Sequence, residues 1–439
     1  MIKICMVGTG YVGLVSGACM ADFGHRVTCV DINPERISDL HRGIMPIYEP
    51  GLETLVKKNT SEGRLLFTTS LAEGLADADV AFIAVQTPMS ESGEADLQYV
   101  LKVGEQIGEL MDHYLVVVTK ITVPVGTNRK LRDVIRNAQK KPVEFDQASN
   151  PEFLREGSSI EDFMRPDRVV IGVETQRAEE LMREIYRPLY LLDTPIFKTG
   201  IETAELIKYA SNAFLAVKIS YINEIATLAE NVGADVSDVA KAMGLDKRIG
   251  PKFLHAGLGF GGSCLPKDTN AITHIAQEAG TRMKTVESAI DVNALLPGRA
   301  LAKAERLAGD LTGKTVGILG LAFKPNTDDI RSAPSLPIIA ALKEKGCRIR
   351  VHDPVAMDNY KTVHPDLVYC SSPEEVCTGA EICLLLTEWN QYRQMDLEKL
   401  ASVMSGNAFL DCRNVYDLPH LEKFGFRYDC FGRAAHRSE

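Results

Sequence analysis

Short apolar runs alternate with glycine-rich turns and amphipathic stretches in the first part of the chain. Ile2–Gly8 is an apolar run that leads into a glycine-rich turn, and a small-residue apolar stretch follows over Leu14–Phe23. A second apolar run covers Val27–Val30. This order predicts a strand, a turn, a helix and a strand within about thirty residues. Further runs at Val80–Val85 and Leu115–Ile121 predict more strands, so we expect a parallel sheet with helices on both faces.

The pattern changes at about residue 201. Residues 202–232 contain neither Pro nor Gly, and their apolar side chains fall on one broad face. This predicts one helix of about 30 residues, roughly 45 Å long. Its apolar positions are Leu206, Ile207, Ala210, Phe214, Val217, Tyr221, Ile225, Leu228 and Val232. Helical patterns continue to Ala308, which predicts an all-α middle region whose long helix links two lobes and offers a dimer face.

Beyond Gly313 the first pattern returns. Lys314–Gly320 predicts a strand and a glycine turn, Pro334–Lys345 a helix, and Arg348–His352 a second strand. More strands are expected at Glu381–Leu386 and Ala408–Leu410. The fold class is therefore predicted as α/β, with two Rossmann-like doubly wound lobes joined by a long central helix and an all-α middle domain. The expected domains are residues 1–200, 201–310 and 311–439.

Charge and cysteine content narrow the class of protein. The chain of 439 residues has 49 Lys and Arg against 59 Asp and Glu, and it contains no basic run, which argues against nucleic acid or an anionic membrane as a partner. The apolar runs are far shorter than the ~20 residues that span a bilayer. Ten cysteines without a CxxC pair or zinc-type spacing predict reduced thiols, a cytoplasmic location and no bound metal.

The first turn carries the pattern Gly8-x-Gly10-x-x-Gly13, with Tyr11 and Val12 between its last two glycines. After a strand and before a helix, such glycines allow a tight turn, close approach of a pyrophosphate and close helix–strand packing. The free N–H groups of the helix N-terminus bind phosphate.

The second strand ends at Asp31, a carboxylate that accepts both hydroxyls of an adenosine ribose and repels a 2′-phosphate. These residues together predict NAD rather than NADP as the cofactor. Arg36, five residues further on, is a candidate for a contact on the adenine side. The alternative is a purely structural turn in an α/β domain.

Two threonines follow later strands. Thr87 comes after the third strand and Thr122 after the next one, so both are expected at the carboxyl edge of the sheet, where open α/β sheets bind ligands. An ordinary loop turn is the competing interpretation of each.

Glu152 and Glu156 are four residues apart in Asn150–Gly157. If this stretch forms a helical turn, the two carboxylates face one side, where one acts as a general base and the other orients it. Two solvated acids that pair with Arg155 or Arg165 are the alternative, which spacing alone favours.

Lys208 and Asn212 are four residues apart on the long predicted helix. A buried lysine there needs a partner, and a lysine and an amide on one helix face suit the stabilisation of an oxyanion. A snorkelling lysine beside a polar notch is an equally good interpretation.

The stretch from Gly257 to Asp268 is the most informative. Four glycines precede Cys264, which allows a ligand to approach the thiol closely. Lys267, or a helix N-terminus, favours the thiolate form, and Asp268 lies on the same side if a helix begins at Leu265. Beside a nicotinamide site, a nucleophilic thiol indicates oxidation of an aldehyde through a thiohemiacetal and a thioester.

These motifs together resemble those of the UDP-glucose/GDP-mannose dehydrogenase family over about residues 1–430. The matching segments are GTGYVG (8–13), PIYEPGL (46–52), NPEFLREG (150–157), ELIKYASNAF (205–214), GFGGSCLPKD (259–268) and LAFKPNTDDIRSAPS (321–335). The resemblance implies two successive NAD-dependent oxidations at C6 of UDP-glucose, giving UDP-glucuronate for polysaccharide biosynthesis, and a homodimer formed through the central helix.

The resemblance also implies catalytic roles. Cys264 is the nucleophile that holds the thiohemiacetal and the thioester, and Lys208 and Asn212 stabilise oxyanions. Asp268 positions or activates water, with Thr122 in the same network. Glu156 serves in acid–base steps of hydrolysis, and Glu152 lies beside the sugar.

Binding residues are implied in the same way. NAD is expected at Gly8, Gly10, Tyr11, Val12, Gly13, Asp31, Arg36, Thr87, Thr122, Glu156, Lys267 and Arg331. The substrate is expected at Glu152, Phe153, Leu154, Lys208, Asn212, Arg248, Phe253, Leu254, Gly261, Cys264, Phe323, Lys324 and Arg413. Arg248 would reach the site of the neighbouring subunit, and Arg413 would hold the ribose or the diphosphate.

Three alternatives stay open. In the first, the substrate is another nucleotide sugar, such as GDP-mannose or UDP-N-acetylmannosamine; the segment Arg248–Leu254 favours UDP-glucose by resemblance. In the second, the protein is a simple two-electron hydroxyacid dehydrogenase, which would not need Cys264 for its reaction. A nucleotide-sugar sensor would be expected to have lost Cys264, Lys208 or Asp268, all of which are present.

Overall fold

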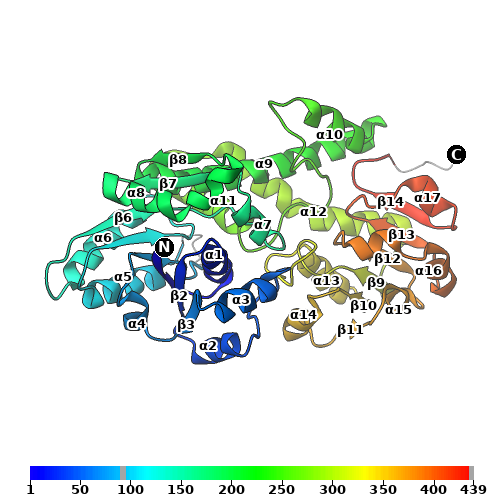
Figure 1. Cartoon of the computed structure of the whole chain (residues 1–439). Coiled ribbons are helices and arrows are strands. Elements are labelled where there is room, and N and C mark those ends of the chain that lie inside the picture. Colours follow the sequence, from blue (N-terminus) through cyan, green and yellow to red (C-terminus); the bar gives the residue numbers. More distant parts are fainter. Residues whose placement is uncertain (89–94, 435–439) are drawn as a thin grey trace. The chain divides into compact units, whose positions relative to one another are not determined.

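The computed structural model describes residues 1–88 and 95–434 (Figure 1). The chain forms two compact units. The first unit comprises Met1–Ser211 with Asn270–Gly280, and the second comprises Asn212–Thr269 with Thr281–Glu439. The predicted three-part division, with boundaries after residues 200 and 310, stays a prediction about functional segments.

The first unit holds a sheet with helices packed against it. Its strands are β1 Lys3–Val7, β2 Arg26–Val30, β3 Leu65–Thr68, β4 Val80–Ile83, β5 Leu115–Thr119, β6 Phe145–Ser149, β7 Val169–Val173 and β8 Ile196–Thr199. Its helices are α1 Tyr11–Asp22, α2 Pro34–His41, α3 Leu52–Ser61, α4 Leu71–Leu75, α5 Gln98–Leu110, α6 Thr127–Ala138, α7 Ser159–Met164, α8 Gln176–Ile185 and the 3₁₀ helix η1 Arg187–Leu192.

The strands of this sheet lie in the order β3-β2-β1-β4-β5-β6-β7-β8. The first six make the doubly wound parallel arrangement that the sequence predicts. The pair β6–β7 is antiparallel, so β7 and β8 extend the sheet in the opposite direction. The wholly parallel sheet that the pattern predicted is therefore wrong at this edge.

Both faces of this sheet are buried, which explains its continuous apolar strands. Along β1, Ile4 and Met6 belong to one core cluster, whereas Cys5 and Val7 belong to a second cluster. Successive side chains of a strand point to opposite faces, so β1 divides the two cores.

Two helices cross from one unit to the other. Helix α9, Ile201–Val232, has 32 residues and confirms the long helix predicted over 202–232. The boundary between the units falls within it, between Ser211 and Asn212. Helix α11, Leu265–Glu278, begins in the second unit and ends in the first.

The second unit repeats the doubly wound order in a sheet of β11-β10-β9-β12-β13-β14, all parallel. These strands are β9 Thr315–Leu319, β10 Arg348–His352, β11 Val368–Tyr369, β12 Ile382–Leu385, β13 Ala408–Asp411 and β14 Arg427–Cys430. The helices are α10 Val236–Leu245, α12 Lys284–Ala308, α13 Ser335–Glu344, α14 Met357–Val363, α15 Pro373–Cys377, α16 Leu397–Val403, α17 Leu418–Glu422 and the 3₁₀ helix η2 Asn390–Gln394. The predicted fold class is confirmed.

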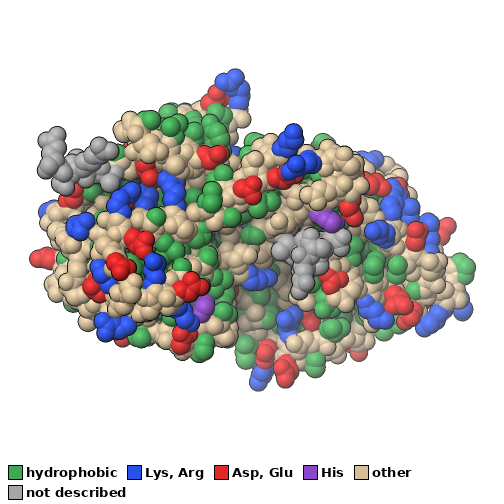
Figure 2. Space-filling model, turned by 180° about the vertical axis from the view of Figure 1, so that it is seen from behind, with side chains coloured by type: hydrophobic (Ala, Val, Ile, Leu, Met, Phe, Trp, Pro, Cys, Tyr) green, Lys and Arg blue, Asp and Glu red, His purple; other side chains and the backbone are tan. Residues whose placement is uncertain are grey.

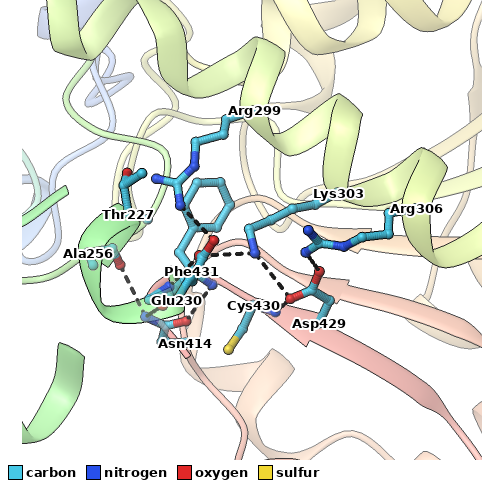
Figure 3. A network of polar contacts seen from close by, with 12 residues as sticks. Thr227, Glu230, Ala256, Arg299, Lys303, Arg306, Asn414, Asp429, Cys430 and Phe431 are labelled. Carbon is cyan, nitrogen blue, oxygen red and sulfur yellow. Dashed lines mark hydrogen bonds and ion pairs between the residues drawn. The ribbon is translucent and has the colours of Figure 1, made fainter. Parts of the chain in front are cut away.

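Helix α12 anchors β14 through a chain of alternating charges (Figure 3). Lys303, whose side chain is 4% exposed, lies 3.0 Å from Glu230 of α9 and 3.1 Å from Asp429 of β14. Arg299 also pairs with Glu230, and Arg306 with Asp429. Because each buried charge has an opposite neighbour, the network holds the last strand of the sheet to two helices.

One face of the molecule has mixed charge. Lys and Arg side chains are intermixed with Asp and Glu side chains over the face in Figure 2. Among the residues that the structure describes, no helix has an apolar segment long enough to cross a membrane.

Candidate active site

The turn between β1 and α1 is shaped by its glycines. Gly8 has φ +105°, and a Cβ there would lie 2.7 Å from the carbonyl oxygen of Ala84. A Cβ on Gly13 would lie 2.0 Å from the oxygen of Gly8. At Gly10, in contrast, no heavy atom lies within 4 Å of a Cβ position. Gly8 and Gly13 therefore serve packing, whereas the space at Gly10 leaves the backbone open to a pyrophosphate.

The helix that follows offers its backbone to an anion. Tyr11 and Val12 open α1, and its N-cap residue makes no side-chain hydrogen bond to it. The first N–H groups of a helix have no partner within the helix, so they favour phosphate. This arrangement fits the pyrophosphate of NAD.

Asp31 lies at the end of β2, where the ribose was expected. Its Oδ2 accepts hydrogen bonds from the backbone and side chain of Thr9, at 2.9 and 2.7 Å, and pairs with Arg36 at 3.1 Å. Burial opposes ionisation of this carboxyl, but hydrogen bonds from Asn33 and Thr9 and the charge of Arg36 outweigh it and lower its pKa. Asp31 is thus held as a carboxylate beside the turn.

Glu49 is a residue of this region that our interpretation left without a role. Its buried carboxylate accepts hydrogen bonds from the Tyr11 hydroxyl, from Gly157 N at 2.6 Å and from Ser159 N at 2.8 Å. Glu49 therefore ties the cofactor turn to the end of the loop that carries Glu152 and Glu156. The matching segment 46–52 was the signal that could have found it.

The two threonines lie together at the carboxyl edge of the sheet. Thr87 follows β4, and its hydroxyl donates to the backbone oxygen of Thr122, which follows β5, at 3.3 Å. The segment after Thr122 is held by Glu205 of α9, which accepts hydrogen bonds from the N–H groups of Gly126 and Asn128. Burial raises the pKa of Glu205, although these hydrogen bonds oppose the shift.

The stretch Asn150–Gly157 is a loop, not a helical turn, and α7 begins only at Ser159. The expectation that Glu152 and Glu156 share a helix face is therefore wrong. Glu152 is 5% exposed and lies 2.9 Å from Lys208, so it is not a solvated acid. Arg155 pairs with Asp162 instead, 2.6 Å away.

The rest of this loop is partly exposed. Glu156 is half-buried. Phe153 has the guanidinium of Arg168 3.5 Å from its ring centroid, and the ammonium of Lys208 5.3 Å from it. Leu154 donates its N–H to Glu152, which folds the loop around that carboxylate.

Lys120 anchors the start of the loop and was not expected. Its buried ammonium donates to Asn150 Oδ1 and to the Tyr186 hydroxyl, both at 3.0 Å. Burial lowers its pKa to about 7; the charge of Glu152 opposes this shift and that of Lys208 adds to it. No sequence pattern marked it, because a lysine after an apolar strand resembles any lysine at a strand end.

Lys208 and Asn212 both lie on α9 and are buried, and each has an acidic partner. Lys208 pairs with Glu152, which gives the buried cation the partner that it needs. Asn212 donates from Nδ2 to Asp268 at 2.6 Å, and Asp268 is 1% exposed. Lys267 pairs with the other oxygen of Asp268 at 2.7 Å. The structure thus brings together Asn212, Asp268 and Lys267 within the second unit.

Cys264 directly precedes α11, which begins at Leu265 as expected. Its backbone oxygen accepts the N–H of Asp268 at 2.8 Å, and its Sγ lies 3.5 Å from the Ser263 hydroxyl. The thiol therefore lies at a helix N-terminus, the setting that favours a thiolate. The ammonium of Lys267 pairs with the carboxylate of Asp268, and the expected influence of Lys267 on the thiol stays a prediction.

The four glycines before Cys264 have a different cause from the one expected. A Cβ on Gly259 would lie 2.0 Å from Asn293 Oδ1, and one on Gly262 would lie 2.7 Å from the Phe323 ring. Gly257 and Gly261 are equally close to protein atoms. These glycines let the loop pack against the protein, so by themselves they do not indicate a ligand.

Further predicted substrate residues lie in the second unit. Phe253 has φ +65° and Leu254 is 3% exposed. Lys324 has its ammonium 5.5 Å from the Phe323 ring centroid. Arg248 is different, because its side chain is 89% exposed and pairs only with Asp246 among the described contacts.

Two predicted arginines make contacts with the protein itself. Arg413 donates to the oxygens of Leu386 at 2.7 Å and Phe323 at 3.2 Å. Arg331 pairs with Asp329 at 2.7 Å and accepts the N–H of Gly262 at its backbone oxygen. Their contacts with a sugar nucleotide or with NAD stay predictions.

Comparison with known proteins covers almost the whole chain. Residues 2–190, 202–295 and 317–418 match the NAD binding, central and UDP binding domains of the UDP-glucose/GDP-mannose dehydrogenase family. A UDP-glucose 6-dehydrogenase of Rhizobium meliloti is 48% identical over 98% of this chain and 100% of its own.

Solved structures agree with this assignment. The structure of a UDP-glucose dehydrogenase from Pyrobaculum islandicum has a TM-score of 0.89 and 41% identity, and covers 94% of this chain and 95% of its own. A UDP-D-ManNAc dehydrogenase from Pyrococcus horikoshii has a TM-score of 0.86 and 28% identity, with 98% and 99% covered. The chain belongs to the UDP-glucose/GDP-mannose dehydrogenase family and carries that family's NAD binding domain.

Proposed function

We propose that this protein oxidises UDP-glucose twice at C6 to give UDP-glucuronate. Two buried pairs carry the proposal. Asn212 of α9 donates to Asp268 of α11, the helix that begins after Cys264, and Lys208 of α9 pairs with Glu152. A thiol, a cation, an amide and carboxylates suit an aldehyde that becomes an acid. The names of the relatives support UDP-glucose as the substrate.

The cofactor residues fit NAD. We assign Gly8, Gly10, Tyr11, Val12 and Gly13 to the pyrophosphate and Asp31 to the adenosine ribose, with Arg36, Thr87, Thr122, Glu156, Lys267 and Arg331 as further candidates. NAD, when bound, accepts one hydride from the sugar in each of the two oxidations.

In the first oxidation C6 loses a hydride, the hydroxyl proton leaves to a base, and an aldehyde results. The Cys264 sulfur then adds to the aldehyde carbon, which forms a C–S bond and a thiohemiacetal. Lys208 and Asn212 donate hydrogen bonds to the oxygen that gains negative charge in this addition. Such donors aimed at a developing oxyanion typically contribute a factor of about 10²–10³ to kcat.

In the second oxidation the thiohemiacetal loses a hydride and a proton to become a thioester on Cys264. Water then attacks the thioester carbon, the C–S bond breaks, and the carboxylate leaves. Asp268 and Thr122 position the water, and Glu156 transfers its proton, while Glu152 keeps Lys208 beside the sugar. The whole sequence consumes one water molecule and restores the thiol.

A panel of nucleotide sugars tests the substrate. We expect NADH from UDP-glucose, and much less from GDP-mannose or UDP-N-acetylmannosamine, with UDP-glucuronate identified by mass spectrometry. NADH from one of the other sugars alone would contradict the substrate and leave the chemistry intact. A single hydride per sugar would favour the simple dehydrogenase instead.

We further propose a homodimer through α9. Within the second unit this helix exposes Phe214, Tyr221 and Leu228, spaced by seven residues, with exposed fractions of 64%, 46% and 55%. This spacing places the three side chains on one stripe of the helix. The exposed Arg248 would then reach the partner's site. Tyr221→Asp should produce a monomer in light scattering; a dimer in that variant would contradict this interface.

We also propose a cytoplasmic location. The ten cysteines have no disulfide partner in the described structure, as expected of a reducing compartment. We assign cofactor binding to residues 1–200, the central helix and the Cys264 loop to 201–310, and UDP-sugar binding to 311–439.

A further inference from the structure

The loop before Cys264 is held at one residue by a pair of hydrogen bonds. Asn293 of α12 accepts the N–H of Phe260 at Oδ1, 2.8 Å away, and donates from Nδ2 to the oxygen of the same residue at 2.9 Å. Both polar groups of one peptide residue are thus bonded by a single carboxamide. Such a pair fixes the position and the direction of the chain, because the N–H must face the carboxamide oxygen and the carbonyl must face the carboxamide nitrogen.

The neighbouring glycine makes this clamp possible. Gly259 has φ +77°, and a Cβ on it would lie 2.0 Å from Oδ1 of Asn293. Any side chain at position 259 would therefore collide with the carboxamide or displace it. The loop and the amide are fitted to one another four to five residues before the thiol.

Pro297 lies four residues after Asn293 in the same helix. A proline inside a helix has no N–H for the carbonyl four residues earlier, and its ring crowds that carbonyl. The carbonyl concerned is that of Asn293. Helix α12 therefore lacks one backbone hydrogen bond at Asn293, the residue whose side chain holds the loop.

Other described hydrogen bonds of the loop each involve one backbone group of a residue. Gly257 donates its N–H to Asn223 Oδ1 at 2.9 Å, and Gly262 donates to the backbone oxygen of Arg331 at 2.9 Å. Asn414, in the network of Figure 3, donates to the oxygen of Ala256 at 3.5 Å. Among these described contacts, only that of Asn293 bonds both backbone groups of one residue.

We propose that Asn293 is a positioning residue for the Cys264 thiol. By clamping Phe260 it sets the path of the loop that delivers the sulfur to the aldehyde carbon. It does not touch the reacting atoms in this account. The proposal rests on the proposed function, because it assigns Cys264 the role of nucleophile.

The experiment compares Asn293→Ala, Asn293→Asp and the control Asp291→Asn, an exposed position on the same helix. The aspartate keeps an acceptor for the N–H of Phe260 but faces its carbonyl with a second acceptor. We expect kcat with UDP-glucose to fall 10- to 100-fold in both Asn293 variants, with KM within threefold of the wild type. Asp291→Asn should keep the wild-type values.

A second measurement needs no sugar nucleotide. The rate at which iodoacetamide alkylates Cys264 is followed by peptide mass spectrometry, with the half-buried Cys347 as the internal standard. Both Asn293 variants should change the Cys264 rate at least fivefold and leave the Cys347 rate unchanged. This readout decides the positioning role even if UDP-glucose is not the substrate.

A purely structural role gives another result. Asn293→Ala would then lower the midpoint of thermal unfolding, while kcat per folded molecule stays within twofold of the wild type and Cys264 reacts at the wild-type rate. Either unchanged kcat or unchanged Cys264 reactivity in folded protein would overturn the proposal.

Discussion

The two doubly wound sheets share a strand order but differ at the first turn. In both, a glycine with positive φ follows the first strand, Gly8 at +105° and Gly320 at +95°. An aspartate, Asp31 or Asp353, directly follows the second strand. The residues after the glycine differ, because Thr9-Gly10 stands in one turn and Leu321-Ala322 in the other.

The two aspartates show what this difference does. Asp353 has no exposed surface, and its two oxygens accept hydrogen bonds from five donors of the protein. The donors are the N–H groups of Leu321, Ala322, Val355 and Ala356 and the indole of Trp389. Asp31 is 8% exposed and bonds Thr9, Asn33 and Arg36. The second turn is filled by the protein itself. The position that the first sheet leaves for a cofactor therefore stabilises the fold in the second sheet.

The largest expected effect is that of Asp353→Ala. The change leaves five buried donors without their acceptor, and each such loss costs about 1–3 kcal/mol. We expect the free energy of unfolding, measured in urea, to fall by about 4 kcal/mol or more. A loss below about 1 kcal/mol would contradict the claim that Asp353 stabilises the second turn.

Asp31→Ala should affect binding more than stability. It removes the acceptor proposed for the adenosine ribose, so we expect the Kd for NAD to rise about 10- to 100-fold, or ~1.4–2.7 kcal/mol. Isothermal titration without sugar nucleotide measures this Kd. The variant should also discriminate less against NADP. An unchanged affinity for NAD would contradict the assignment of Asp31 to the cofactor.

Two buried lysines, one in each unit, extend the comparison beyond the turns. Burial lowers the pKa of Lys120 to about 7, whereas the unfolded side chain titrates near its ordinary value of ~10.4. Between these pH values the unfolded state binds more protons, so this group makes stability rise with pH by up to about 1.4 kcal/mol per unit. Lys120→Met should remove that slope in urea titrations at pH 7 to 10.

Lys303 is the matched control. It lies between two carboxylates, so Lys303→Met leaves buried negative charge and should cost about 3–5 kcal/mol. If both changes cost the same at neutral pH, the distinction between an ion-paired and an uncompensated buried lysine would fail.

The strands and the long helix were predictable from local pattern. The run Val27–Val30 lies in β2, and the segment 202–232 became α9 almost residue for residue, because burial of one face imposes a period that a sequence displays. The antiparallel β7 was not predictable, since a strand's direction depends on pairing far along the chain.

The site shows the same limit. The spacing of Glu152 and Glu156 imitates a helix, yet the loop is shaped by the distant partners Lys208 and Lys120, which no local pattern encodes. The glycines before Cys264 were visible, but their cause, close packing against Asn293 and Phe323, appears only in three dimensions.

The most direct test of the central claim is the amount of NADH formed per UDP-glucose consumed, in the wild type and in Cys264→Ser. We predict two NADH per sugar for the wild type, and a variant that stalls before a free acid is released. One NADH per sugar, unaffected by the change at Cys264, would contradict the four-electron thiol mechanism.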